Sequence, residues 1–194
     1  GFHRRQGELP QPEAIETALQ TVGSQWLVLD SSAQTVQFDK PAMEINLGSI
    51  GKGYALDRCS ALLEEAGIED YIMHGGMSSI VARGSRQLSC NEQPGWHVAL
   101  RHPLKPGKRL AEICLHNRAL GTSGSANQFF YHQGKRFGHV IDPRTGHSAD
   151  EVLSVTVLAP RAALADALAT AFFVMGKEQA FDYCQQHPSV GALF

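Results

Sequence analysis

The chain has 194 residues, of which 43% are hydrophobic and 19% are charged, with a formal net charge of −2 and a sequence pI of about 6.5. This length and composition are typical of one globular domain with a sizeable core. Because basic residues are not in excess, the sequence shows no electrostatic footprint for nucleic acid or an anionic membrane, and its longest apolar run is too short to span a bilayer.

Hydrophobic periodicity predicts the elements along the chain. A helix is expected over residues 10–22, with Pro12 in its first turn, and short strands over 26–29 and 35–38. Residues 43–47 alternate apolar and polar as a strand would, and the apolar steps after Gly51 predict a helix that ends before Gly67. Further strands are expected over residues 71–74, 79–82, 96–101, 110–115, 120–122, 129–132, 136–141, 153–158 and 190–194, helices over 162–175 and 178–186, and a polar loop over 84–95. This irregular mixture predicts an α+β fold with a largely antiparallel sheet and interspersed helices.

The four cysteines are Cys59, Cys90, Cys114 and Cys184. They are widely spaced and form no Cys-x-x-Cys pair, so they indicate neither a zinc site nor dithiol chemistry. Cys59 and Cys114 lie on apolar patterns, which predicts that both are buried thiols.

A glycine-rich stretch, residues 46–58, reads NLGSIGKGYALDR. Its three glycines let the backbone approach a ligand, and the N-terminus of the helix behind them favours phosphate. Lys52 adds a positive charge at the same place. The spacing fits neither Walker A nor the dinucleotide fingerprint, in which a glycine would replace Leu56. From these residues alone, a phosphate loop and a tight strand-to-helix turn remain equal alternatives.

The helix expected over residues 162–175 carries only two polar side chains, Asp166 and Thr170. A helix that is apolar almost all round is a buried helix, and a buried carboxylate needs a partner. Since the two residues are four apart, they share one helical face and offer oxygen ligands to a hard divalent cation. The alternative is structural: Asp166 caps a loop or pairs with an arginine, while Thr170 bonds back to its own helix.

A third stretch, His139 to Gly146, reads as a strand that ends in a turn. His139 lies close to Asp142, which makes these two residues better candidates for chemistry than the other histidines. Arg144 suits either a phosphate contact or a salt bridge that locks the turn.

These three stretches resemble, in order, the signatures of the FAD:protein FMN transferases, the ApbE family, whose members were formerly called thiamine biosynthesis lipoproteins. The matching strings are residues 46–57, His139 to Gly146 and Asp166 to Ala171. The resemblance covers residues 41–194 as a flavin transferase domain and leaves residues 1–40 as a helix and hairpin, the remnant of a longer N-terminal region. In the family that region supplies part of the wall around FAD, so a chain that starts at Gly1 is expected to leave the flavin cleft open on one side and to bind FAD weakly.

The resemblance implies a Mg²⁺-dependent transfer of FMN from FAD to a Ser or Thr hydroxyl of an acceptor protein, with release of AMP. Two alternatives follow from the same likeness: hydrolysis of FAD to FMN and AMP, or a flavin-binding relative without transfer activity. The implied partners are FAD and an acceptor protein, without nucleic acid, and with a membrane only through an anchor that this chain lacks. The implied location is the periplasm or the extracytoplasmic face of the cell membrane.

The resemblance also implies roles for individual residues. His139 and Asp142 would be catalytic, and a metal would be held by the carbonyl of Gly51 together with Asp166 and Thr170. The residues implied to contact FAD are Gly48, Ser49, Gly51, Lys52, Gly53, Gly75, Gly76, Ser123 and His139. Met77 departs from the family pattern because an aspartate usually stands there, and Ser78 or Ser79 would offer hydrogen-bond donors in its place.

Overall fold

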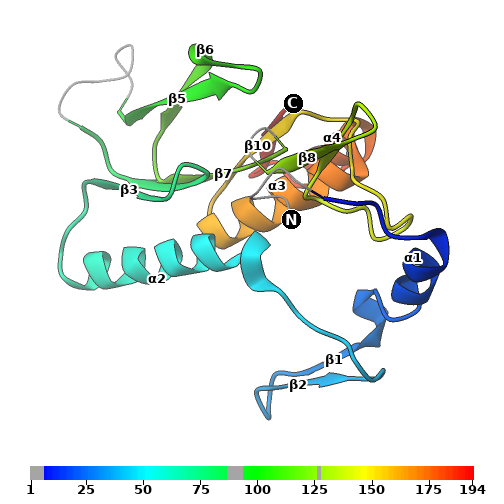
Figure 1. Cartoon of the computed structure of the whole chain (residues 1–194). Coiled ribbons are helices and arrows are strands. Elements are labelled where there is room, and N and C mark those ends of the chain that lie inside the picture. The colour runs from blue at the N-terminus through cyan, green and yellow to red at the C-terminus, as the bar shows by residue number, and fades with distance from the viewer. Residues whose placement is uncertain (1–6, 87–93, 126–127) are drawn as a thin grey trace. The chain divides into compact units, whose positions relative to one another are not determined.

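The computed structural model describes residues 7–86, 94–125 and 128–194. The chain folds into two compact units, whose residue ranges can be located in Figure 1 by its colour bar. Unit 1 consists of Gly1–Asn46 and Gln128–Asp150, and unit 2 of Leu47–Asn127 and Glu151–Phe194. The segment 128–150 therefore groups with the N-terminal part of the chain, whereas the division based on the family resemblance, at residue 41, stays a prediction.

Unit 1 contains a short helix and two hairpins. Its elements are α1 (Pro12–Leu19), a 3₁₀ turn (Ser24–Trp26), β1 (Leu27–Asp30), β2 (Thr35–Phe38), β8 (Phe129–His132) and β9 (Lys135–Gly138). The helix is shorter than expected because its last turn tightens: the amides of Thr21 and Val22 bond three residues back, to Ala18 and Leu19. Both hairpins are antiparallel. The β8–β9 turn uses positive φ angles at Gln133 (50°) and Gly134 (77°), as a two-residue hairpin turn requires.

The strand expected over residues 43–47 is wrong. Residues 43–46 form no regular element, and Leu47–Ser49 is a 3₁₀ turn. The alternating residues are not buried, since Ile45 is 44% exposed and Leu47 is 64% exposed. Alternation predicts a strand only where one face is covered and a neighbour completes the ladder, and no described strand pairs with this segment.

Unit 2 is built on a five-stranded antiparallel sheet with the order β11-β10-β7-β4-β3. Its strands are β3 (Tyr71–Gly75), β4 (Ser79–Arg83), β7 (Arg118–Gly124), β10 (Ser154–Ala159) and β11 (Gly191–Leu193). A separate hairpin is formed by β5 (Trp96–His102) and β6 (Lys105–Leu115), so the strand expected over residues 110–115 begins earlier than predicted. Together these elements confirm the predicted α+β fold with largely antiparallel strands.

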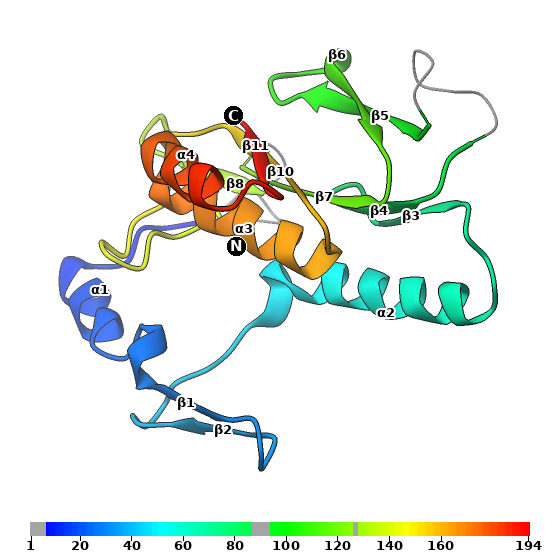
Figure 2. The ribbon, with the colours of Figure 1, turned by 180° about the vertical axis from the view of Figure 1, so that it is seen from behind.

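The two faces of the sheet are covered by different elements, as the views from both sides show (Figures 1 and 2). The β5–β6 hairpin packs on one face, where Val98, Leu100 and Leu115 meet Ala82 and Leu120. Helices α2 (Gly51–Glu65) and α3 (Ala162–Met175) lie on the other face, and α4 (Lys177–Gln186) follows α3. Alternate residues of each strand therefore contact either the hairpin or the helices.

The expected burial of Cys59 and Cys114 is wrong, because both residues are exposed. Cys59 lies off the face of α2 that buries Gly53, Leu56 and Ser60. Cys114 stands opposite the exposed His97, on the outer face of the β5–β6 hairpin. In the polar loop expected over residues 84–95, residues 84–86 and 94–95 form neither helix nor strand, whereas residues 87–93, which include Cys90, lie outside the described part of the chain.

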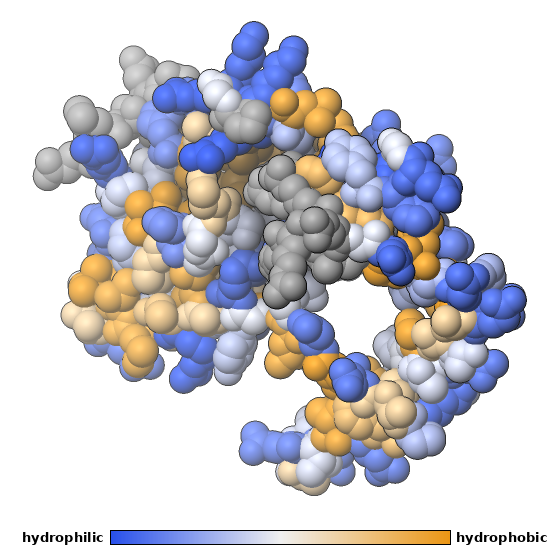
Figure 3. Space-filling model, viewed as in Figure 1, coloured by the Kyte–Doolittle hydropathy of each residue, from blue (hydrophilic) through white to orange (hydrophobic). Residues whose placement is uncertain are grey.

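Hydrophobic side chains also reach the surface, notably over α2 and over the β1–β2 hairpin (Figure 3). On the hairpin, Leu29 is 71% exposed and Val36 is 52% exposed, and the register makes them cross-strand partners on the same face. Across the described ranges 7–86, 94–125 and 128–194, none of the helices combines the length and hydrophobicity needed to cross a membrane.

Candidate functional site

Helix α3 is held unusually close to its neighbours by two glycines. A Cβ atom added at Gly53 of α2 would lie 2.2 Å from the carbonyl oxygen of Ala162. A Cβ added at Gly121 of β7 would lie 2.6 Å from the backbone of Ala165. Only glycine allows backbones to approach so closely, so α3 packs directly against the backbones of α2 and of the sheet at these two positions. Asp166 of α3 is thereby brought against the glycine-rich stretch.

Asp166 lies at this crossing and is 6% exposed. Its Oδ1 accepts a hydrogen bond from the hydroxyl of Ser79 at 2.7 Å, and its Oδ2 accepts one from the backbone N–H of Gly53 at 2.8 Å. Within the described residues the carboxylate forms no salt bridge. The alternative in which this carboxylate pairs with an arginine is therefore not found among the described residues, where its partners are one hydroxyl and one glycine-loop amide.

Burial is the main electrostatic influence on Asp166, and it raises the pKa of the carboxyl above its ordinary value. The hydrogen bonds from Ser79 and Gly53 and the charge of Lys52 lower the pKa, while the charge of Asp57 raises it further. A carboxylate in this position is stabilised by additional positive charge. Since each of its oxygens accepts one described hydrogen bond, each keeps a lone pair for another ligand.

Thr170 and Ser123 meet one helical turn further along α3. The two hydroxyl oxygens are 2.9 Å apart, and the Thr170 hydroxyl also donates to the carbonyl of Asp166 at 3.4 Å. The back-bonding expected of a helical threonine is thus present, but it is long and is shared with Ser123 on β7. The structure brings together three predicted site residues, since Asp166, Thr170 and Ser123 all lie between α3 and the same face of the sheet.

The glycine-rich stretch forms a 3₁₀ turn and the start of α2. Gly48 and Ser49 lie in the turn, and Gly51, Lys52 and Gly53 form the first turn of the helix. The N-cap residue Ile50 makes no side-chain capping bond, and among the leading amides that of Gly53 donates to Asp166. Gly51 and Lys52 are exposed, so the positive dipole end of the helix lies at an exposed segment. Of these predicted residues, Gly53 is the one whose contact with Asp166 is observed.

The turn between β3 and β4 lies beside the start of α2. A Cβ at Gly75 would lie 3.5 Å from the Cβ of Lys52, which places the end of β3 next to the glycine-rich stretch. Gly76 has a φ of 68°, and Met77 at the tip of the turn is 73% exposed. Of the two serines predicted to replace the missing acid, Ser79 is directed at Asp166, whereas the carbonyl of Ser78 accepts the amide of Thr122.

His139 and Asp142 belong to unit 1. The Nδ1 of His139 lies 3.3 Å from the carbonyl oxygen of Gln128. Because a carbonyl can only accept, the neutral ring carries its proton on Nδ1 and its lone pair on Nε2. His139 is half-buried, and in this tautomer Nε2 is the ring nitrogen with the basic lone pair.

Asp142 is bound by Arg144 through a salt bridge of 2.7 Å, and the backbone amide of Arg144 also donates to the carboxylate at 2.8 Å. The hydrogen bond from the Arg144 side chain is the main cause that lowers the pKa of Asp142. The salt bridge that locks the turn is therefore observed. A carboxylate stabilised in this way is a weaker base than the imidazole of His139.

The turn that carries Asp142 also forms one wall of an apolar groove within unit 1, with a volume of about 1130 Å³. The opposite wall is the apolar face of α1, including Ile15 and Leu19, and the stacked rings of Phe130 and Phe137 complete the lining.

The residues at Asp166 can be tested as a metal site by their chemistry. Among the described residues, no group of three or more His, Cys, Asp or Glu side chains is placed to hold a metal ion. The donors at hand are one carboxylate, hydroxyls and backbone carbonyls, which are all oxygen ligands. This set fits Mg²⁺, which takes one or two carboxylates and completes its shell with water and substrate phosphate.

Sequence reasoning missed one contact at this site. Asp57 accepts hydrogen bonds from the backbone amides of Ala162 at 2.7 Å and Ala163 at 3.1 Å. The sequence signal for this contact was the spacing: Asp57 lies four residues after Gly53, so both residues are on the same face of α2.

The chain is similar along its whole length to proteins of one family. The family model described as ApbE family matches residues 1–194. A curated FAD:protein FMN transferase of Haemophilus influenzae is 32% identical over 192 residues, which cover 96% of this chain and 54% of the relative. One of Salmonella typhimurium is 35% identical over 184 residues, 93% of this chain and 51% of the relative. The chain thus spans about half the length of the curated relatives it matches.

Two solved structures share the fold. The ApbE protein of Thermotoga maritima matches with a TM-score of 0.83 and 31% identity, covering 96% of this chain and 59% of that protein. The flavin transferase ApbE of Vibrio cholerae matches with a TM-score of 0.80 and 28% identity, covering 96% of this chain and 57% of that protein.

Proposed function

The chain belongs to the ApbE family, and from this premise we propose that it transfers FMN from FAD to a Ser or Thr hydroxyl of an acceptor protein and releases AMP. The observation that carries the proposal is Asp166, a buried carboxylate without a described salt bridge whose Oδ2 accepts the Gly53 amide of the glycine-rich stretch. Curated relatives that cover most of the chain are FAD:protein FMN transferases. The proposal extends the reaction in their name to this chain.

The proposed transfer is a phosphoryl-group displacement. The acceptor oxygen forms a bond to the phosphorus of the FMN half, and the bond from that phosphorus to the bridging oxygen breaks. AMP leaves with the bridging oxygen, and the hydroxyl proton passes to Nε2 of His139. The Nδ1 contact with Gln128 supports this role because it keeps Nε2 unprotonated in the neutral ring.

The proposed metal is Mg²⁺, held by Asp166, Thr170 and the carbonyl of Gly51. When bound, it would neutralise charge that develops on the phosphoryl oxygens. The oxygen donors at Asp166 and Thr170 support this assignment, and so does the raised pKa of Asp166, which indicates that burial disfavours its charge when no cation is bound. Lys52 and the exposed start of α2 at Gly51 would bind the phosphates.

The proposed partners are FAD and an acceptor protein, and the proposed location is the periplasm or the extracytoplasmic face of the membrane, as in the family. Met77 bears on the alternative of a flavin binder without transfer activity, because it is an exposed methionine where the family has an acid.

The test is incubation of the chain with FAD, Mg²⁺ and an acceptor protein, followed by chromatography for AMP and mass spectrometry of the acceptor. We expect AMP and an acceptor heavier by one FMN. His139→Gln should abolish both products, whereas the matched control His147→Gln, in the exposed part of the next turn, should retain them. AMP without a heavier acceptor would indicate a pyrophosphatase, and bound FAD without AMP would indicate a binding protein.

A further inference from the structure

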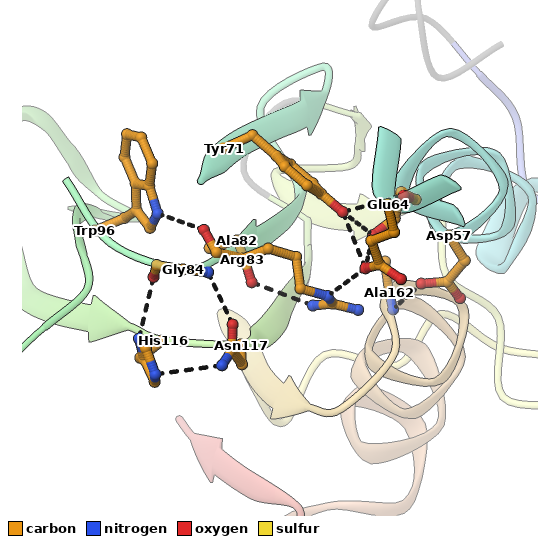
Figure 4. Close-up of polar contacts among 11 residues, drawn as sticks. Asp57, Glu64, Tyr71, Ala82, Arg83, Gly84, Trp96, His116, Asn117 and Ala162 are labelled. Atoms are coloured by element: carbon orange, nitrogen blue, oxygen red, sulfur yellow. Dashed lines mark hydrogen bonds and ion pairs between the residues drawn. The ribbon is translucent and has the colours of Figure 1, made fainter. Parts of the chain in front are cut away.

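Helix α3 begins without a cap of its own. Its N-cap residue, Arg161, makes no side-chain capping bond. The first amides of a helix have no partner within the helix, so a buried helix start needs an external acceptor. Asp57 supplies this acceptor from α2, because its carboxylate accepts hydrogen bonds from the amide of Ala162, shown in Figure 4, and from that of Ala163.

Asp57 and Gly53 form hydrogen bonds with α3 at two points. They are one turn apart on α2, and both are directed at α3. Asp57 holds the first two residues of α3, while the amide of Gly53 holds Asp166 in its second turn. Because Asp57 and Gly53 lie on one rigid helix, their hydrogen bonds determine both the distance and the rotation of α3 relative to the glycine-rich stretch. The side chain of Asp57 is only 10% exposed, so water competes little for these bonds.

The nearby Arg161 does not explain the position of Asp57. Its Nε is 3.5 Å from the carboxylate, and its side chain is 68% exposed. An ion pair of this kind contributes little, since solvent screens it. The two hydrogen bonds from the amides of Ala162 and Ala163 therefore determine where the Asp57 carboxylate lies.

We propose that Asp57 is a positioning residue for the candidate metal site: by capping α3 from α2, it fixes Asp166 against the amide of Gly53 in the orientation that binds a divalent cation. The proposal rests on the proposed function for the metal site, whereas the hold of Asp166 on the Gly53 amide is observed and can be tested without metal. Asp57 does not touch the cation, and its effect passes through the backbone of α3. Outer partners that orient a metal ligand typically contribute about 10- to 100-fold in metal affinity.

Two measurements on the full chain test the proposal. The first is the affinity for Mn²⁺, used as an oxygen-seeking probe, by electron paramagnetic resonance. The second is hydrogen exchange of the Gly53 amide, measured by nuclear magnetic resonance on the metal-free chain. Asp57→Ala should weaken Mn²⁺ binding about tenfold or more. It should also speed the exchange of the Gly53 amide, since Asp166 would no longer be held there.

Two variants act as controls. Asp57→Asn keeps an acceptor for the helix start and should restore both readouts nearly to the wild-type values. Ser60→Ala removes a buried hydroxyl of α2 that contacts Tyr71 rather than α3, and should leave both unchanged.

Three results would overturn the proposal. Wild-type behaviour of Asp57→Ala would show that the cap does not position Asp166. Equal losses in Asp57→Ala and Asp57→Asn would show that charge matters instead of capping. Equal losses in Ser60→Ala would show general loosening of α2. If the wild type bound no Mn²⁺, the metal assignment would fail, and exchange of the Gly53 amide would still decide the role of Asp57.

Discussion

Replacing Gly53 by alanine tests the close contact between α2 and α3. The added Cβ would lie 2.2 Å from the carbonyl oxygen of Ala162 and 2.6 Å from the amide nitrogen of Ala163. Both neighbours are backbone atoms of a buried helix, so neither can rotate away as a flexible side chain would. The helices must separate, which also stretches the hydrogen bond from Gly53 to Asp166.

The expected change in the free energy of unfolding is the balance of opposing effects. Alanine favours a helix over glycine by about 1 kcal/mol. Overpacking costs about 1–3 kcal/mol, and losing a hydrogen bond to a charged group costs about 1.5–3 kcal/mol. The costs are larger than the gain, so we expect Gly53→Ala to lower the free energy of unfolding by about 2–5 kcal/mol. In a chain of this size such a loss corresponds to a fall in Tm of about 4–20 °C.

The assay is thermal and urea unfolding followed by circular dichroism, with Gly51→Ala as the matched control. Gly51 also lies in the first turn of α2, but a Cβ there would meet no atom within 4 Å. We expect this control to be as stable as the wild type or up to about 1 kcal/mol more stable. If Gly53→Ala were as stable as Gly51→Ala, the close approach of α2 and α3 would be refuted.

Two further predictions concern charge. Because burial raises the pKa of Asp166 above its ordinary value of 3.8, protonation of this group stabilises the folded chain most at acidic pH, and that contribution is lost as the pH rises through the raised pKa. In metal-free melts from acidic to neutral pH, Asp166→Asn should therefore lose less stability than the wild type, and it should show no Mg²⁺-dependent rise in Tm with FAD; a wild type without such a rise would contradict the metal assignment. Lys52→Ala removes an exposed charge and should weaken FAD binding at low salt but much less at high salt, measured by flavin fluorescence, and unchanged affinity at low salt would show that Lys52 is only a solvated residue at the helix start.

The sequence by itself determined the features that depend on neighbouring residues. The near absence of polar side chains predicted α3 with the bounds that the structure shows, Ala162–Met175, and also its burial. The strands expected over residues 129–132 and 136–141 correspond to the β8–β9 hairpin, whose Gln133-Gly134 turn has two positive φ angles set by local turn geometry. Two of the three family stretches meet in the structure, where Gly53 contacts Asp166, and the roles assigned to their residues stay predictions.

Only the tertiary structure decided what covers each face and which partners meet. Residues 43–47 have the alternation of a strand, but no described strand pairs with them, so no ladder forms. Cys114 lies on an apolar pattern, but the hairpin turns that residue outward. The partners of Asp166 are 113 residues away at Gly53 and 87 residues away at Ser79. Periodicity indicates on which face of its own helix or strand a side chain lies. The group that this side chain contacts depends on how distant segments pack. Here Gly53 and Gly121 determine that packing, because they allow the backbones to come into contact.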